Sequence, residues 1–275
     1  MNHWNMPGPA ILFCPADRPE RYAKALHRAD AVILDLEDAI RPESREAARR
    51  SLIEYPIDPD RTIVRINPAG TDDHQSDLAA LAQTSYRAVM LAKSESAESV
   101  AQVGYDVVAL VETPAGALAA AQIAGAPNCI GLMWGAEDLV AAMGGRSSRF
   151  TAAEAHAGRY RDVARQVRGM VRLASSAHGR FAIDSVHIDI ADTDGLFAEA
   201  LDAVNLGYEA TACIHPSQVE VVRAAYRPAP DDIRWAEGVL EAAATSAGGV
   251  FRVDGQMIDA PLLAQARAII RRAGV

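Results

Sequence analysis

Short apolar runs alternate with amphipathic stretches along most of the 275-residue chain. The apolar runs have the length and the β-branched residues of strands, and turn-forming or polar residues follow each of them. They predict eight strands, at residues 10–15, 31–36, 62–67, 88–93, 107–112, 130–134, 181–185 and 211–215. Between the strands, apolar positions recur with helical spacing at residues 18–28, 43–55, 77–84, 151–177 and 195–206.

The strands are continuously apolar rather than alternating, which is typical of a parallel sheet covered by helices on its faces. Eight repeats of strand and helix are the number that closes a (β/α)8 TIM barrel. The alternative is an open doubly wound sheet, but Ala-Asp-Arg-Pro-Glu follows the first strand in place of a glycine-rich dinucleotide loop. We therefore predict an α/β fold with a TIM barrel over residues 1–226.

Residues 227–275 exceed what a barrel needs. A helix at residues 217–226 leads to a proline break at Pro228 and Pro230, and another helix follows at 231–245. A glycine-rich, β-like segment at residues 247–257 precedes a last helix that ends near Arg272. We predict that this C-terminal helical extension belongs to the same domain and acts as a lid or as an arm in a homo-oligomer.

The composition excludes several classes of function. A net charge of −9 without a basic stripe argues against nucleic-acid binding. No segment is long and apolar enough to span a bilayer, and the N-terminus lacks the pattern of a signal peptide. The three cysteines lie in apolar runs without metal-site spacing, so we expect reduced core thiols in a cytoplasmic protein.

Two acidic residues close neighbouring apolar strands and carry most of the chemical information. Glu112 ends one strand, and Asp138 follows the next. Carboxyl ends of adjacent parallel strands converge, and an unpaired buried charge is costly. One or two carboxylates, completed by water and substrate oxygens, are the protein ligands that Mg²⁺ prefers. The pair therefore predicts a magnesium site, with helix capping as the alternative.

Arg65 is flanked by apolar residues inside a strand, so its guanidinium must meet carboxylates. Its two-pronged geometry suits a substrate carboxylate or a developing enolate oxygen. The alternative is a structural ion pair with Glu37 or Asp38. The acids at positions 35, 37 and 38 end the preceding strand, and we expect some of them to hold Arg65 and metal-bound water.

Two further cationic positions have open interpretations. Arg18 and Lys24 lie on the first helical turns after the first strand, where they form either a phosphate site or an exposed basic face. Lys93 ends the fourth strand and either pairs with a carboxylate or, if desolvated, acts as a Schiff-base nucleophile.

Seven motifs occur in order along the chain: FCPADRPE (13–20), ILDLEDA (33–39), VRIN (64–67), LVETP (110–114), WGAEDL (134–139), CIHP (213–216) and GQMID (255–259). They resemble the citrate lyase β-subunit-like family, among relatives of the HpcH/HpaI aldolases and malyl-CoA lyases, and most closely its stand-alone mycobacterial-type members. The resemblance runs from about residue 9 to residue 271.

The resemblance implies roles for individual residues. Glu112 and Asp138 would hold Mg²⁺, Arg65 would bind the substrate carboxylate, and Arg18 and Lys24 would contact the phosphates of coenzyme A. The backbone amides of Gly135 and Ala136 would lie near the metal-bound oxygens. Asp259 would be an acid-base carboxylate, often supplied by a neighbouring subunit, because members of the family are commonly trimers or hexamers.

These observations lead to one hypothesis and two alternatives. The hypothesis is a Mg²⁺-dependent carbon–carbon lyase that cleaves a 3-hydroxyacyl-CoA to an oxo acid and an acyl-CoA, with Arg65, Glu37 and Asp259 as catalytic residues. The malyl-, citramalyl-, citryl- and hydroxymethylglutaryl-CoA esters are the substrates considered. The alternatives are a metal-independent Schiff-base aldolase using Lys93 and a non-catalytic subunit that binds acyl-CoA or acyl-carrier protein.

Overall fold

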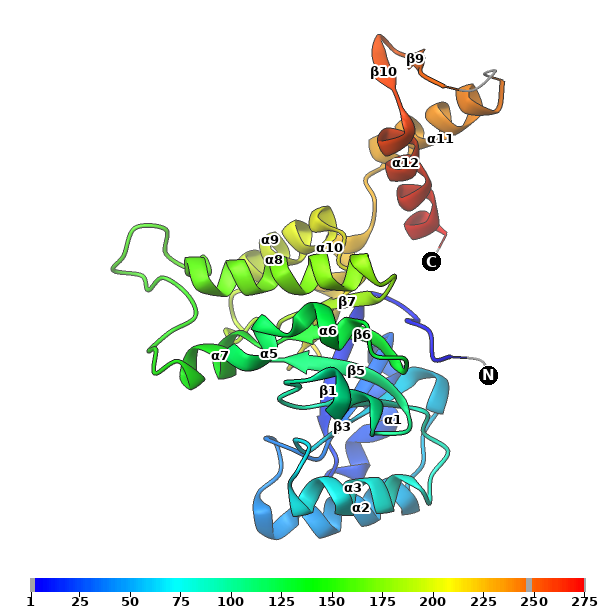
Figure 1. The fold of residues 1–275 in the computed structure, drawn as a ribbon. Coiled ribbons are helices and arrows are strands. Elements are labelled where there is room, and N and C mark those ends of the chain that lie inside the picture. Colours follow the sequence, from blue (N-terminus) through cyan, green and yellow to red (C-terminus); the bar gives the residue numbers. More distant parts are fainter. Residues whose placement is uncertain (1–2, 246–248, 275) are drawn as a thin grey trace. The chain divides into compact units, whose positions relative to one another are not determined.

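Eight parallel strands form a closed barrel, in the order β1 to β8, with β8 paired to β1 (Figure 1). The structure is a computed structural model that describes residues 3–245 and 249–274. The predicted TIM barrel is therefore confirmed. The strands are β1 (Ala10–Pro15), β2 (Ala31–Asp35), β3 (Thr62–Ile66), β4 (Ala88–Leu91), β5 (Asp106–Val111), β6 (Cys129–Trp134), β7 (Phe181–Asp184) and β8 (Ala210–Cys213).

The helices follow the strands and cover the outside of the barrel (Figure 1). Both faces of the strands are buried as a result, which is why the sequence shows continuous apolar runs. The helices of this part are α1 (Tyr22–Arg28), α2 (Arg45–Glu54), α3 (Asp72–Leu81), α4 (Ala97–Ala101), α5 (Pro114–Leu118), α6 (Ala120–Ala124), α7 (Ala136–Ala142), α8 (Asp162–Ala177), α9 (Thr193–Leu206) and α10 (Gln218–Tyr226).

Apolar side chains from the strands fill the barrel interior, among them Ile33, Met90 and Ile183. Trp4, from the segment before β1, joins this core and packs its ring 6.0 Å from that of Phe181. The backbone N–H of Trp4 donates to Asp106, the first residue of β5. The N-terminal segment thus closes the amino end of the barrel, and the carboxyl ends of the strands are left for chemistry.

The C-terminal residues form a second compact unit, and the division falls between residues 222 and 223, inside α10. This unit contains α11 (Pro230–Thr245), β9 (Phe251–Val253), β10 (Gln256–Ile258) and α12 (Ala260–Ala273). Ala236, Val239, Ile258 and Ala266 form its own small core. The predicted helical extension is therefore present.

The β-like segment predicted at residues 247–257 is a hairpin of β9 and β10 within the described residues, and residues 246–248 lie outside them. Its turn is formed by Asp254 and Gly255, both with positive φ angles of 48° and 82°. Asp-Gly is a favoured sequence for such a turn, because positive φ at both positions matches the twist of the strands.

Two predicted helix boundaries are wrong. The helix predicted at residues 151–177 begins only at Asp162, because residues 151–161 form a loop closed by an isolated bridge between Arg149 and Tyr160. Gly158, at a φ of 81°, permits the turn that a helix cannot make. The helix predicted at residues 77–84 is α3, which begins earlier because the Thr71 side chain accepts a hydrogen bond from the His74 N–H.

The three cysteines are buried and free, as expected for reduced core thiols. Among the described residues, no helix is both long enough and apolar enough to cross a membrane.

Candidate active site

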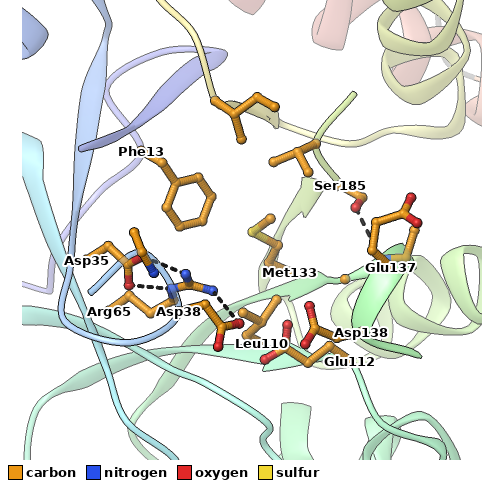
Figure 2. A pocket seen from close by; sticks show the side chains of 15 residues that line it. Phe13, Asp35, Asp38, Arg65, Leu110, Glu112, Met133, Glu137, Asp138 and Ser185 are labelled. Atoms are coloured by element: carbon orange, nitrogen blue, oxygen red, sulfur yellow. Dashed lines mark hydrogen bonds and ion pairs between the residues drawn. The ribbon is translucent and has the colours of Figure 1, made fainter. Parts of the chain in front are cut away.

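Glu112 and Asp138 meet because of the register between two strands. Val111 at the end of β5 pairs with Trp134 at the end of β6, so the residues that follow leave the barrel side by side. Glu112 is the next residue after β5, and Asp138 lies in the first turn of α7 after β6. Both carboxylates line the same cavity, where Figure 2 shows them together.

Acids outnumber cations at this end of the barrel, where the cavity lining has five carboxylates and Arg65. Glu112 is only 2% exposed, and one of its oxygens accepts a hydrogen bond of 3.0 Å from the backbone N–H of Lys93. Burial, followed by the charge of Asp138, raises the pKa of Glu112 to about 8. A divalent cation between the two carboxylates would remove this cost.

Gly135 permits the close approach of Glu112 to β6. A Cβ atom at position 135 would lie 2.8 Å from both Cβ and Oε2 of Glu112. Any larger residue would therefore displace the carboxylate from its position beside Asp138. The glycine of the Trp-Gly-Ala-Glu-Asp sequence is thus a steric requirement of the acid pair.

The acid pair fits Mg²⁺ better than a metal that needs more protein ligands. Within residues 3–245 and 249–274, no group of three or more His, Cys, Asp or Glu side chains has metal-binding geometry. Zn²⁺ in catalytic sites takes three protein ligands, whereas Mg²⁺ keeps several waters and uses one or two carboxylates with substrate oxygens. Glu112 and Asp138 provide the latter set.

Arg65 lies on the opposite side of the cavity, where the pairing of β2 with β3 places it beside Asp35. Its Nε and Nη2 atoms donate to the two Asp35 oxygens, both at 2.6 Å. The third nitrogen, Nη1, lies 3.1 Å from Glu37, and the guanidinium stacks 5.0 Å from the centre of the Phe13 ring. The expected acids do hold Arg65, because Asp35 occupies the two-pronged edge and Glu37 lies beside Nη1.

Lys93 is paired with a carboxylate rather than isolated in an apolar pocket. Its ammonium contacts Glu37 and lies 3.7 Å from Asp38 and 3.8 Å from Asp138. Although burial acts in the opposite direction, the hydrogen bond and charge of Glu37 raise the pKa of Lys93. A Schiff-base lysine needs a lowered pKa to be an amine at neutral pH, so these surroundings disfavour that alternative.

Figure 2 shows the side chains that line the cavity between these groups. The volume of this cavity is about 250 Å³. One wall is charged and consists of the acids and Arg65. The other wall is apolar and is formed by Phe13, Leu110, Met133, Val186 and Ile214. Such a cavity suits a small acid with a short hydrocarbon part, with its carboxylate on the charged side.

The two backbone amides implied by the resemblance differ in their availability. The N–H of Gly135 donates to the Val111 carbonyl at 3.0 Å, so it belongs to the sheet. The N–H of Ala136 donates to Oγ of Ser185 at 3.3 Å, a long bond that a substrate oxygen could replace.

The other predicted site residues lie outside the cavity lining. Arg18 is exposed after β1, 3.8 Å from Asp17, and Lys24 is exposed on α1. Asp259 belongs to the second unit, where its side chain caps α12 by accepting from the Leu262 N–H. Their roles toward a substrate stay predictions.

Ser185 and the apolar wall are site features that the sequence does not reveal. Ser185 follows β7 and lines the cavity, but a serine at a strand end carries no distinctive signal. Phe13 and Met133 look like core residues because they lie within apolar strands. Their position on strands that reach the cavity is the only signal that could have identified them.

Known proteins similar to this chain belong to one family. Residues 10–105 and 103–216 match the family described as HpcH/HpaI aldolase/citrate lyase. The chain belongs to this family. A citrate lyase subunit beta-like protein of Mycobacterium tuberculosis is 54% identical over 97% of this chain and 96% of its own length. A (3S)-malyl-CoA thioesterase of Cereibacter sphaeroides is 32% identical over 99% and 97%, respectively.

A solved structure of the family has the same fold and contains small ligands. The crystal structure of CitE from Mycobacterium tuberculosis in complex with magnesium, acetoacetate and coenzyme A matches with a TM-score of 0.90 and 54% identity. The match covers 98% of each chain. The family resemblance read from the motifs is confirmed, and the magnesium predicted from the acid pair is present in that relative.

Proposed function

We propose that the chain is a Mg²⁺-dependent carbon–carbon lyase that cleaves a 3-hydroxyacyl-CoA to an oxo acid and an acyl-CoA. The observation that carries this proposal is the acid pair of buried Glu112 and partly exposed Asp138, facing Arg65 across a cavity of about 250 Å³. The family membership and the ligands of the Mycobacterium tuberculosis relative support it.

The residues around the cavity match the charges of such a reaction. Mg²⁺ would be held by Glu112 and Asp138 and would polarise the hydroxyl and carboxylate oxygens of the substrate. A base takes the proton of the hydroxyl, whose oxygen becomes the carbonyl of the oxo acid. The bond between the two carbons breaks, and its electron pair passes to the thioester enolate, which then takes up a proton. Arg65, through Nη1, stabilises the substrate carboxylate, and Glu37 orients Arg65. Asp259 supplies the proton to the enolate carbon.

The cavity size suits only the oxo-acid part of the substrate. A volume of about 250 Å³ lies below the range of pockets that enclose drug-sized ligands, so coenzyme A must extend from its mouth. Arg18 and Lys24, exposed after β1, supply positive charge for its phosphates. We propose further that the chain forms a homotrimer or hexamer in which Asp259 serves a neighbouring subunit.

The deciding experiment is a turnover screen of the purified protein with Mg²⁺ against malyl-, citramalyl-, citryl- and hydroxymethylglutaryl-CoA. We expect an oxo acid and an acyl-CoA from at least one ester, loss of turnover with EDTA, and no trapping of Lys93 by borohydride. Cleavage that survives EDTA and is trapped by borohydride would favour the Schiff-base aldolase. No turnover, together with a stably bound acyl-carrier protein, would favour the non-catalytic subunit.

Asp259 can be tested without disturbing the fold. Asp259→Asn keeps a good helix cap for α12, so the free energy of unfolding should not change. We expect turnover to fall by about tenfold or more while Mg²⁺ binding is retained. Mixing Asp259→Asn with Asp138→Asn under subunit exchange should restore part of the activity if Asp259 acts in a neighbouring subunit. Normal turnover of Asp259→Asn alone would remove its catalytic role.

One product assay also separates cleavage from hydrolysis. The Cereibacter sphaeroides relative is named as a thioesterase, and this favours thioester hydrolysis as a second candidate activity. Release of free coenzyme A thiol without an oxo acid would identify hydrolysis of the intact hydroxyacyl ester. Release of an oxo acid before free thiol would identify cleavage as the first step.

A further inference from the structure

We infer that Lys93 sets the charge of the active site. Its ammonium weakens the binding of Mg²⁺ and strengthens the binding of the anionic substrate. The inference rests on the proposed function, because it assigns Lys93 a role at the same site. Two independent features of Lys93 support it, the conformation of its backbone and the surroundings of its ammonium.

The backbone of Lys93 adopts a conformation that is rare for a lysine. Its φ angle is 48°, in the left-handed region that residues other than glycine seldom occupy. In this conformation the Lys93 N–H donates to Oε1 of Glu112 at 3.0 Å. Strained backbone of this kind is retained where the surrounding structure requires it, and here it supplies a backbone hydrogen bond to a proposed metal ligand.

β5 and the segment that follows it both contact the turn at Lys93 and Ser94. The N–H of Ser94 donates to the carbonyl of Leu110 in β5 at 2.9 Å. After β5, the chain passes so close to the turn that a Cβ atom at Gly116 would lie 2.3 Å from the Ser94 carbonyl oxygen. The position of Lys93 relative to Glu112 is therefore fixed by packing and not only by its own hydrogen bond.

The ammonium of Lys93 lies among three carboxylates. It contacts Oε1 of Glu37 and lies within 4 Å of oxygens of Asp38 and Asp138. The other Glu37 oxygen lies 3.1 Å from Nη1 of Arg65. One side chain thus connects the acids of the metal side with the acid that orients the proposed substrate-binding arginine.

The charge of this ammonium has opposite effects on the two ligands of the site. It repels a cation held by Asp138, because its nitrogen is 3.8 Å from that carboxylate. It attracts the carboxylate of an oxo acid bound in the cavity that Asp38 and Asp138 line. Its removal should therefore strengthen Mg²⁺ binding and weaken oxo-acid binding. A purely structural role predicts that both weaken together.

The test measures both affinities by calorimetry in Lys93→Met, first with Mg²⁺ and then with pyruvate at saturating Mg²⁺. We expect the Kd for Mg²⁺ to fall by about tenfold and the Kd for pyruvate to rise by about tenfold, each equivalent to about 1.4 kcal/mol. Lys93→Arg keeps the charge and should retain both wild-type affinities within about threefold. A change of both affinities in the same direction, or of neither, overturns the inference.

Two further variants control for misfolding and for the loss of a remote positive charge. Lys93→Gly keeps the N–H and relieves the backbone strain, so it gives the same test if Lys93→Met does not fold. Arg50→Met removes one positive charge from an exposed pair on α2 and should change neither affinity. Calorimetry measures binding without turnover. If the wild type binds Mg²⁺ and pyruvate but cleaves no CoA ester, the proposed function is refuted, and the affinities of the Lys93 variants still decide this inference.

Discussion

Two glutamates of the barrel, Glu112 and Glu199, are buried to different extents, and their pKa values shift in opposite directions. Burial and the charge of Asp138 raise the pKa of Glu112 to about 8. At Glu199 burial acts in the same direction, but hydrogen bonds from His187 and Arg149 hold its pKa below the usual value. The difference lies in their partners, because the Arg149 side chain donates to Glu199, whereas the strongest charge acting on Glu112 is that of another acid, Asp138.

The surroundings of Glu199 form a balanced cluster around β7. Arg149 donates to both Glu199 oxygens at 3.1 and 2.9 Å, and Arg168 binds both oxygens of Asp184 at 3.0 and 2.8 Å. The indole N–H of Trp134 donates a further hydrogen bond of 2.7 Å to Asp184. Buried charges that are paired in this way hold structure, whereas the acids Glu112 and Asp138 leave room for a cation.

The largest effect should come from removing one acid of the unbalanced pair. Asp138→Asn deletes a charge that Mg²⁺ requires, and we expect kcat/KM to fall by at least about 10³-fold, since a metal contributes several kcal/mol to such reactions. The free energy of unfolding should hold or rise, because a repulsion with Glu112 disappears. Calorimetry with Mg²⁺ and urea unfolding measure the two quantities, and unchanged Mg²⁺ affinity would contradict the metal assignment.

The balanced cluster should respond in the reverse manner. Arg168→Met leaves Asp184 buried without its cation, and we expect the free energy of unfolding to fall by about 3 kcal/mol. Arg50→Met, at a pair whose arginine side chain is 62% exposed, should cost less than about 1 kcal/mol. Urea unfolding compares the two variants. Equal losses would mean that burial does not distinguish the two kinds of ion pair.

The features that sequence reasoning predicted are those that depend on local pattern. Continuous apolar strands predict the barrel, and acids at the ends of adjacent strands predict that Glu112 and Asp138 converge. Both follow from the repeat of strand and helix, because parallel neighbours place their carboxyl ends at one edge. The Asp254–Gly255 turn likewise follows from its residues, which tolerate positive φ.

The features that it did not predict depend on register and on long-range packing. Asp35 takes the two-pronged edge of Arg65 because β2 and β3 pair those two residues, and the sequence does not give that register. The left-handed backbone of Lys93 is imposed by β5, since lysine has no preference for it. The loop at residues 151–161 has helical composition but is held by Arg149, whose guanidinium stacks 4.0 Å from the Tyr160 ring.

Arg65 shares features of both clusters, and a conservative substitution separates them. Arg65→Lys loses the paired bonds to Asp35, so we expect the free energy of unfolding to fall by about 2 kcal/mol. It also loses Nη1, so kcat/KM should fall by about tenfold or more. Arg61→Lys is the control, because, within the part of the chain that the structure describes, Arg61 donates only to backbone carbonyls of Leu26, Ala29 and Asp30. It should lose stability without a kinetic effect, and the same result for Arg65 would make Arg65 structural.

The smallest effect should follow from adding one methyl group beside the unbalanced pair. In Gly135→Ala the new Cβ would lie 2.8 Å from Oε2 of Glu112, so the carboxylate must shift away from Asp138. We expect Mg²⁺ affinity to fall by about tenfold, equivalent to about 1.4 kcal/mol. Overpacking should lower the free energy of unfolding by about 1 kcal/mol.

The control for Gly135→Ala is the same substitution where space is open. Gly169 lies in α8 with no atom within 4 Å of an added Cβ, so Gly169→Ala should leave Mg²⁺ affinity unchanged and stabilise the helix by up to about 1 kcal/mol. Suppose that the two substitutions change the free energy of unfolding in opposite directions and that only Gly135→Ala lowers the Mg²⁺ affinity. This result would show that steric fit holds Glu112 in position for the metal. Equal Mg²⁺ affinity in both variants would mean that the carboxylate adjusts freely, so its position would not depend on the glycine.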